Sequence, residues 1–99
     1  MKAVRWSDRA VAELERIYEF IARDDTVAAQ RWVEALQRAA DRLARFPRSG
    51  RVVPELKRDD LREIVKGNYR LVYQVTEQGP VVVTVFEAHQ RPPENLDPE

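Results

Sequence analysis

The chain has 99 residues, 43% of them hydrophobic, which is the size and composition of one globular domain with one core. It contains no cysteine and equal numbers of basic and acidic residues, so thiol chemistry, disulfides and thiolate zinc sites are excluded and generic nucleic-acid binding is disfavoured. No apolar run approaches the roughly 18 residues of a membrane span, and charges recur too early for a signal peptide, so we expect a cytoplasmic protein that contacts no membrane.

Two helices are predicted in the first half of the chain. Ser7 offers an N-cap oxygen, and apolar residues then recur at spacings of three and four up to about Ala22. Asp25 or Thr26 can cap a second helix with the same pattern, which ends near Phe46 because a proline follows. The short link between the two helices predicts an antiparallel helical hairpin.

The second half of the chain predicts a β-meander. Aromatic and β-branched residues make Tyr69–Val75 the strongest strand signal. Leu61–Val65 precedes it and Val81–Phe86 follows it, each separated from it by a turn. Val52–Leu56 contains a proline and is therefore at best an edge strand.

These elements predict an α+β fold, in which an N-terminal helical hairpin packs on one face of a small C-terminal antiparallel β-sheet. The other face of the sheet is expected to be free for function. In the central strand, Tyr73 lies on the inward face and Arg70 on the outward one. We place one domain at residues 1–91 and a short, acidic, frayed tail at residues 92–99.

The zero net charge hides an asymmetry along the chain. Residues 42–70 hold nine basic and four acidic side chains, a net charge of +5, whereas residues 1–41 carry −1 and residues 71–99 carry −4. The middle third is therefore a candidate surface for binding an anionic partner. The alternative is a solvated face whose charge is balanced by acidic residues nearby in space.

Chemistry that needs a cofactor or metal has no support in the sequence. There is no Gly-rich phosphate loop, and one histidine without any cysteine leaves no transition-metal site, so we expect neither a cofactor nor a bound metal. The remaining candidates are basic and polar residues of the sheet half, namely Arg62, Lys66, Arg70, His89 and Arg91. Pairing of the last two strands would bring Arg70 close to His89 or Arg91.

Such a cluster supports two functions. It would hold RNA phosphates and stabilise the charge that develops as a 2′-hydroxyl attacks, with His89 exchanging a proton. Alternatively, it would bind an acidic protein segment through charge-assisted hydrogen bonds. The purely structural alternative is that each arginine pairs with a local carboxylate such as Glu63 or Glu87.

Three stretches of the chain resemble the RelE/ParE superfamily, the toxins of type II toxin–antitoxin systems. The first is Trp6-Ser7 with the helix that follows, and the second is Phe46-Pro47 leading into Gly50-Arg51 and Pro54-Glu55. The third comprises Leu61–Ile64, the strand Tyr69–Val75, and the last strand into His89-Gln90-Arg91. Together these stretches cover about residues 4–91.

The resemblance implies a fold of two helices on a small antiparallel sheet, as derived above. It also implies a cytoplasmic toxin that inhibits growth and is neutralised in an oligomer with its cognate antitoxin, part of which is disordered when free. A hydrophobic groove along the helices would suit an amphipathic partner helix.

The superfamily divides by target. RelE-like members cleave mRNA at the ribosome and place catalytic arginines where Arg70 and Arg91 stand, and some relatives use a histidine near His89. ParE-like members inhibit DNA gyrase without being nucleases. In this chain no tyrosine follows Arg91, although RelE-like enzymes have a catalytic tyrosine there, and the lysine-rich stretch of those enzymes is reduced to Lys57 and Lys66.

Our leading hypothesis is therefore a ParE-like toxin that inhibits DNA gyrase by binding. The alternatives are a ribosome-dependent mRNA endonuclease that uses Arg70, His89 and Arg91, and a relative that has lost toxicity and only binds its antitoxin. The candidate residues for contacting a target or the antitoxin are Arg51, Arg62, Lys66, Arg70, Tyr73 and Arg91.

Overall fold

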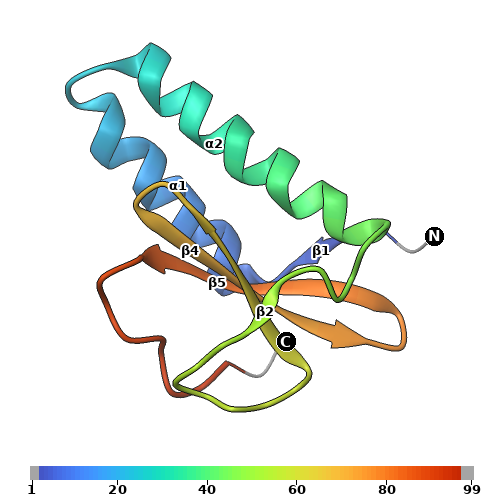
Figure 1. The fold of residues 1–99 in the computed structure, drawn as a ribbon. Coiled ribbons are helices and arrows are strands. Elements are labelled where there is room, and N and C mark those ends of the chain that lie inside the picture. Colours follow the sequence, from blue (N-terminus) through green and yellow to red (C-terminus); the bar gives the residue numbers. More distant parts are fainter. Residues whose placement is uncertain (1–2, 97–99) are drawn as a thin grey trace.

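Two helices lie side by side across one face of a five-stranded sheet (Figure 1). The computed structural model describes residues 3–96. The elements in chain order are β1 (Arg5–Trp6), α1 (Asp8–Ala22), α2 (Thr26–Asp41), the 3-10 turn η1 (Arg42–Ala44), β2 (Arg51–Val52), β3 (Leu61–Lys66), β4 (Tyr69–Thr76) and β5 (Gly79–Glu87). The predicted α+β class, with a helical hairpin on a small sheet, is confirmed.

Side-chain caps begin both helices where the sequence predicts. The Oγ of Ser7 accepts a hydrogen bond from the N–H of Ala10 at 3.1 Å, and a carboxylate oxygen of Asp25 accepts one from Ala28 at 3.0 Å. Each cap satisfies an amide that has no partner within its helix. α1 ends at Ala22, as predicted.

The sheet is mixed, with the strand order β1-β5-β4-β3-β2. The meander β3-β4-β5 and the edge strand β2 pair antiparallel, as expected. β1 adds a parallel edge, because Arg5 lies opposite Val81 and Trp6 opposite Val82. A register shift between Val72 and Tyr73 marks a bulge in the β4–β5 pair.

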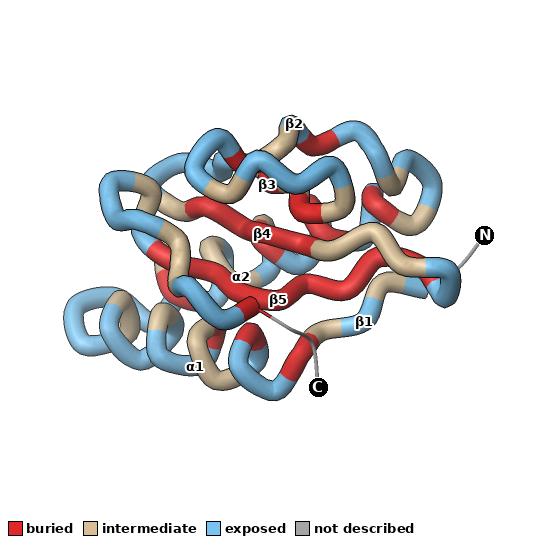
Figure 2. The backbone as a smooth tube through the Cα atoms, turned by 90° about the horizontal axis from the view of Figure 1, so that it is seen from below, coloured by how far each residue is buried: buried red, intermediate tan, exposed pale blue. Residues whose placement is uncertain are grey.

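Each face of the sheet has its own hydrophobic cluster. The cluster under the helices includes Leu36, Leu43 and Tyr73. On the opposite face, Val53 from the β2–β3 loop and Leu96 from the C-terminal segment pack against strand residues of the sheet. The expectation that this face would be free was wrong, because loop and C-terminal residues pack against it. β5 is buried along most of its length and β4 along half of it (Figure 2).

The segment after β5 belongs to this second cluster. Leu96 is 8% exposed, and the side chain of Arg9 donates a hydrogen bond to the carbonyl of Asn95 at 2.6 Å. Part of the expected frayed tail therefore lies against the domain as far as residue 96. The remainder of that segment, residues 97–99, lies outside the described residues.

Within residues 3–96, no helix combines the length and the apolar character needed to cross a membrane.

Candidate functional site

Arg70 lies in a buried cluster of charged side chains on β4. Its Nε donates to Glu63 at 2.8 Å, and Nη1 donates to Glu55 at 2.9 Å and to the carbonyl of Gln90 at 3.2 Å. Its Nη2 donates to Glu55 at 2.7 Å and lies 2.7 Å from a Glu63 carboxylate oxygen. Four hydrogen bonds and the ion-pair contact with Glu63 thus engage all three guanidinium nitrogens, and the side chain is 7% exposed, so it is poorly placed to receive a phosphate group. The ring of Phe86 also packs against it, 5.1 Å from ring centre to guanidinium carbon.

Glu63 joins Arg70 to a second arginine. Its side chain is fully buried, and its other carboxylate oxygen accepts a hydrogen bond from the Nε of Arg51 at 2.6 Å. A buried carboxylate needs such partners, because its desolvation costs several kcal/mol per ion. The structural alternative, an arginine paired with Glu63, is therefore confirmed for Arg70 and extends to Arg51.

The cluster also changes the pKa values of Glu55 and Arg70. The hydrogen bond from Arg70 is the main cause that lowers the pKa of Glu55 from 4.5 to about 2. The same hydrogen bond raises the pKa of Arg70 further above its ordinary value. Both groups are therefore fully charged near neutral pH, and together they hold the β2–β3 loop against β4.

Two further candidates have structural roles on the sheet. Tyr73 has no exposed surface, and its hydroxyl accepts a hydrogen bond from the N–H of Gly50 at 2.9 Å. Burial raises the pKa of Tyr73. Arg62 donates to the carbonyl of Gly50 at 3.0 Å and to the carboxylate of Asp59 at 2.8 Å, and its side chain is 16% exposed. Tyr73 and Arg70 thus do not belong to the surface that a partner meets, because both side chains are buried.

His89 and Arg91 lie at the surface. The side chain of His89 is 74% exposed, and its Nδ1 lies 3.6 Å from the carboxylate of Glu87. The pairing of β4 with β5 does bring Arg70 to the backbone of Gln90, which is the residue between His89 and Arg91. The buried guanidinium and the exposed imidazole nevertheless do not share a cavity, and their catalytic roles stay a prediction.

The charge asymmetry of residues 42–70 is largely neutralised within that stretch. Five of its arginines form ion pairs with its four carboxylates, namely Arg48, Arg51, Arg58, Arg62 and Arg70 with Glu55, Asp59, Asp60 and Glu63. Its other four basic side chains form no ion pair with any described residue, namely Arg42, Arg45, Lys57 and Lys66. The anion-binding surface that we expected over the whole stretch therefore reduces to these four basic positions.

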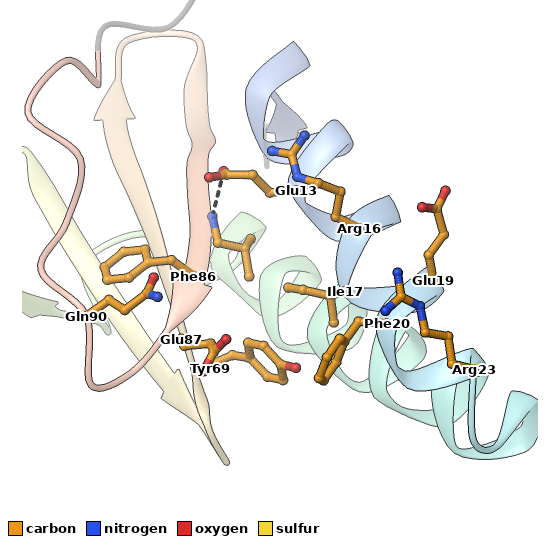
Figure 3. Close-up of a pocket in the computed structure, with 11 residues that line it drawn as sticks. Glu13, Arg16, Ile17, Glu19, Phe20, Arg23, Tyr69, Phe86, Glu87 and Gln90 are labelled. Carbon is orange, nitrogen blue, oxygen red and sulfur yellow. Dashed lines mark hydrogen bonds between the residues drawn. The ribbon is translucent and has the colours of Figure 1, made fainter.

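A groove of about 460 Å³ lies between α1 and the C-terminal end of β5, and we call it the α1–β5 groove (Figure 3). Ile17, Phe20 and Tyr69 line its apolar part, and Arg16 and Arg23 project from the same helix. Phe20 is 66% exposed, which is unusual for a large aromatic side chain without a partner. Aromatic and arginine side chains of this kind are typical of protein interfaces.

The edge of β5 beside this groove is only partly covered. β1 pairs with just two residues of β5, Val81 and Val82. Beyond them, Glu13 accepts hydrogen bonds from the N–H of Val85 at 3.1 Å and from the hydroxyl of Thr84 at 2.8 Å. A carboxylate of α1 thus takes the place of a neighbouring strand's carbonyl, which protects this edge from pairing with other chains.

A second groove, of about 360 Å³, runs along the outer side of the helical hairpin between α1 and α2, and we call it the helical groove. Val11, Leu14, Tyr18 and Val33 line it, and Val11 and Tyr18 are 42% and 39% exposed. Its apolar floor and polar margin suit an amphipathic helix.

The sequence analysis missed most of these groups. Phe20 lies outside the apolar stripe of α1, and an exposed aromatic residue there is the signal that marks the α1–β5 groove. Nothing in the sequence marked Glu55 as a partner of Arg70, because the two residues are 15 positions apart along the chain.

Among residues 3–96, no group of three His, Asp or Glu side chains is placed to hold a metal ion.

Comparison with known proteins gives one consistent family. The model of a family described as the ParE toxin of the type II toxin–antitoxin system parDE matches residues 4–92. A Sinorhizobium fredii protein named as toxin Y4kP is 36% identical over 96% of this chain and 97% of its own length. Toxin ParE1 of Mycobacterium tuberculosis is 37% identical over 86% of both chains.

A relative that carries the RelE name also matches. Toxin RelE2 of Caulobacter vibrioides is 42% identical over 60% of this chain and 67% of its own. A solved structure described as the chromosomal ParDE TA system from P. aeruginosa superposes with a TM-score of 0.73, covering 88% of this chain and 96% of that one. The two chains are 16% identical, so this likeness concerns the fold.

Proposed function

The chain belongs to the ParE toxin family of type II toxin–antitoxin systems, and we propose that it acts in the cytoplasm by binding and inhibiting DNA gyrase. The observation that carries this proposal is that the guanidinium of Arg70 is bound by carboxylates of the protein itself. All three of its guanidinium nitrogens donate hydrogen bonds, to Glu55, Glu63 or the Gln90 carbonyl, and its side chain is 7% exposed. A nuclease arginine must present at least one donor to the phosphate in the transition state. Inhibition by binding requires no such group.

The proposed site of neutralisation is the pair of grooves along α1. A toxin of this kind has an antitoxin partner, and the two grooves are adjacent on the same helix: the α1–β5 groove has an apolar part among charged side chains, and the helical groove has an apolar floor. We propose that an amphipathic segment of the cognate antitoxin occupies both grooves, with its apolar side chains against Phe20 and Tyr18.

Induction in cells distinguishes the candidate targets. We expect induction of the toxin to stop growth and to cause DNA breaks that depend on gyrase, while mRNA stays intact. In a purified system, we expect it to inhibit supercoiling by gyrase and the antitoxin to reverse the inhibition. Rapid fragmentation of mRNA with intact DNA would refute the gyrase proposal and favour the endonuclease, and unimpaired growth would indicate a relative that only binds its antitoxin.

The substitution His89→Gln gives a sharper test. The side chain of His89 is 74% exposed and forms an ion pair with Glu87, which is also exposed, so its replacement should leave the fold unchanged. A gyrase inhibitor should keep its potency, whereas an endonuclease that uses His89 as its proton carrier should lose about 10²- to 10⁴-fold in rate. Toxicity and the rate of mRNA cleavage are the two measurements.

A further inference from the structure

An exposed aromatic side chain lies at the surface just after η1, on a hydrogen-bonded backbone turn. Phe46 is 57% exposed. Its N–H donates a hydrogen bond to the carbonyl of Arg42 at 3.1 Å, and its carbonyl accepts one from Ser49 at 3.1 Å, across a turn that contains Pro47. The backbone on both sides of the ring is therefore fixed, and little conformational entropy remains to be lost when the ring is covered.

Two arginines without ion pairs precede Phe46 within four positions of the chain, in and just after η1. Arg42 and Arg45 are exposed, and neither pairs with a carboxylate within residues 3–96. The four carboxylates of residues 42–70 are all bound by other arginines, and Asp41 also pairs with neither of the two. Two positive charges that no described carboxylate pairs with thus lie within about one turn of the chain from an exposed aromatic residue. We call Arg42, Arg45 and Phe46 the η1 patch.

The patch lies away from the α1–β5 groove. α1 and α2 are antiparallel, and the groove includes Arg23 at the end of α1, next to where α2 begins. The patch follows the opposite end of α2, which is 16 residues long and therefore spans about 24 Å. Phe20 and Arg23 therefore lie at the end of the hairpin opposite the η1 patch, whereas the helical groove extends to Gln37, five residues before Arg42. An antitoxin segment bound at the Phe20 end of α1 would leave the η1 patch uncovered.

We propose that the η1 patch docks the toxin on its target, by receiving an acidic segment of DNA gyrase. Phe46 inserts between apolar groups of that segment, and Arg42 and Arg45 pair with its carboxylates. Aromatic and arginine side chains dominate the binding energy of protein interfaces, and charge complementarity fixes their orientation. A single-stranded nucleic acid fits less well, because it needs several aromatic platforms and a continuous basic groove. This inference rests on the proposed function.

The test uses two matched double variants of the full chain. The first, Phe46→Ser with Arg45→Glu, removes the ring and reverses one charge of the patch. The control, Val27→Ser with Arg31→Glu, makes the same kind of change on α2, where Val27 is 58% exposed. Four properties are measured for each protein: the thermal unfolding midpoint, the concentration that half-inhibits gyrase supercoiling, the affinity for the antitoxin encoded beside the gene, and the affinity for a dT20 oligonucleotide.

We expect the patch variant to need at least about tenfold more protein for half-inhibition of gyrase. Its unfolding midpoint and its affinity for the antitoxin should stay close to those of the wild type, and the control should match the wild type throughout. Inhibition at wild-type potency by the patch variant would overturn the proposal while leaving gyrase as the target. Two other results would also overturn the proposal. If the patch variant lost affinity for the antitoxin, the patch would belong to the antitoxin interface. If the wild type bound the oligonucleotide and the patch variant did not, the patch would be a nucleic-acid site. Wild-type protein that does not inhibit gyrase would refute both this inference and the proposed function.

Discussion

At the scale of single residues, Arg70 shows how burial decides between structure and chemistry. Its guanidinium contacts two carboxylates and one carbonyl and is 7% exposed, so its charge is neutralised inside the protein. Arg51 approaches the same buried Glu63 from β2. The arginine that resembles a catalytic residue in the sequence is, in the structure, the link between β4, β3 and the β2–β3 loop.

The substitution Arg70→Met should therefore act on stability. It leaves the fully buried Glu63 with one ionic partner and removes the main partner of Glu55. We expect the free energy of unfolding to fall by about 3–5 kcal/mol, as measured by urea denaturation, because an uncompensated charge remains buried. Arg31→Met, at an exposed position of α2, should change it by less than about 0.5 kcal/mol. An unchanged stability of Arg70→Met would contradict the structural role.

The low pKa of Glu55 predicts how stability depends on pH. Because folding lowers this pKa from 4.5 to about 2, the Glu55 carboxylate stabilises the folded state above pH 4.5. That contribution is lost as the pH falls from 4.5 towards 2, where the folded protein must also take up the proton. The stability difference between the wild type and Glu55→Gln should therefore be largest near pH 7 and shrink across this range. A difference that is the same at pH 7 and pH 3 would exclude the lowered pKa.

At the scale of secondary-structure elements, the β3–β4 turn docks directly on α2. Gly67 has φ +57°, and an added Cβ there would overlap the ring of Trp32. Trp32 in turn packs edge-on against Tyr69, with ring centres 5.7 Å apart. The contact between sheet and helix at this point requires a residue without a side chain.

We expect Gly67→Ala to lower the free energy of unfolding by roughly 2–4 kcal/mol. About 1–2 kcal/mol comes from the left-handed backbone conformation and the rest from overpacking against Trp32. In the background Trp32→Leu, the same substitution should cost less, because the overpacking part disappears. Asn68→Ala serves as the control. Equal costs in the two backgrounds, in a double-mutant cycle of urea denaturations, would rule out the contact with Trp32.

Local patterns predicted most of the elements, and long-range contacts decided what was not predicted. Ser7 and Asp25 cap their helices as expected, because a cap depends on residues three positions apart. The parallel pairing of β1 with β5 joins residues more than 70 positions apart, and two residues carry no periodicity that reveals it. The contact of Glu55 with Arg70 bridges 15 positions in the same way. The sequence predicted which residues are candidates for the site. Which of these side chains are buried became clear only from the folded structure.

At the scale of the whole molecule, the sheet holds the structural charges and the helical hairpin carries the accessible surfaces. The ion pairs around Glu63 seal the sheet face opposite the helices. Both grooves open along α1, and the η1 patch follows α2. A toxin that is neutralised by one protein and acts on another needs two binding surfaces, and we propose that the grooves and the η1 patch are these two surfaces.

If the α1–β5 groove and the η1 patch bind different partners, one variant should escape its antitoxin and remain toxic. Phe20→Asp places a charge in the apolar part of the α1–β5 groove, at a side chain that is 66% exposed, so the fold should tolerate it. We expect the affinity for the antitoxin, measured by calorimetry, to fall at least about tenfold, because an aromatic anchor is lost and a carboxylate must be desolvated.

The concentration of Phe20→Asp that half-inhibits gyrase should stay within about twofold of the wild-type value, since the groove and the η1 patch lie near opposite ends of α2. In cells, co-expressed antitoxin should then restore growth to the wild type but not to this variant. Val27→Ser, which also changes an exposed apolar side chain of the hairpin, should remain fully neutralised. If Phe20→Asp lost both activities together, the two partners would share one surface, and the assignment of the grooves to the antitoxin alone would be wrong.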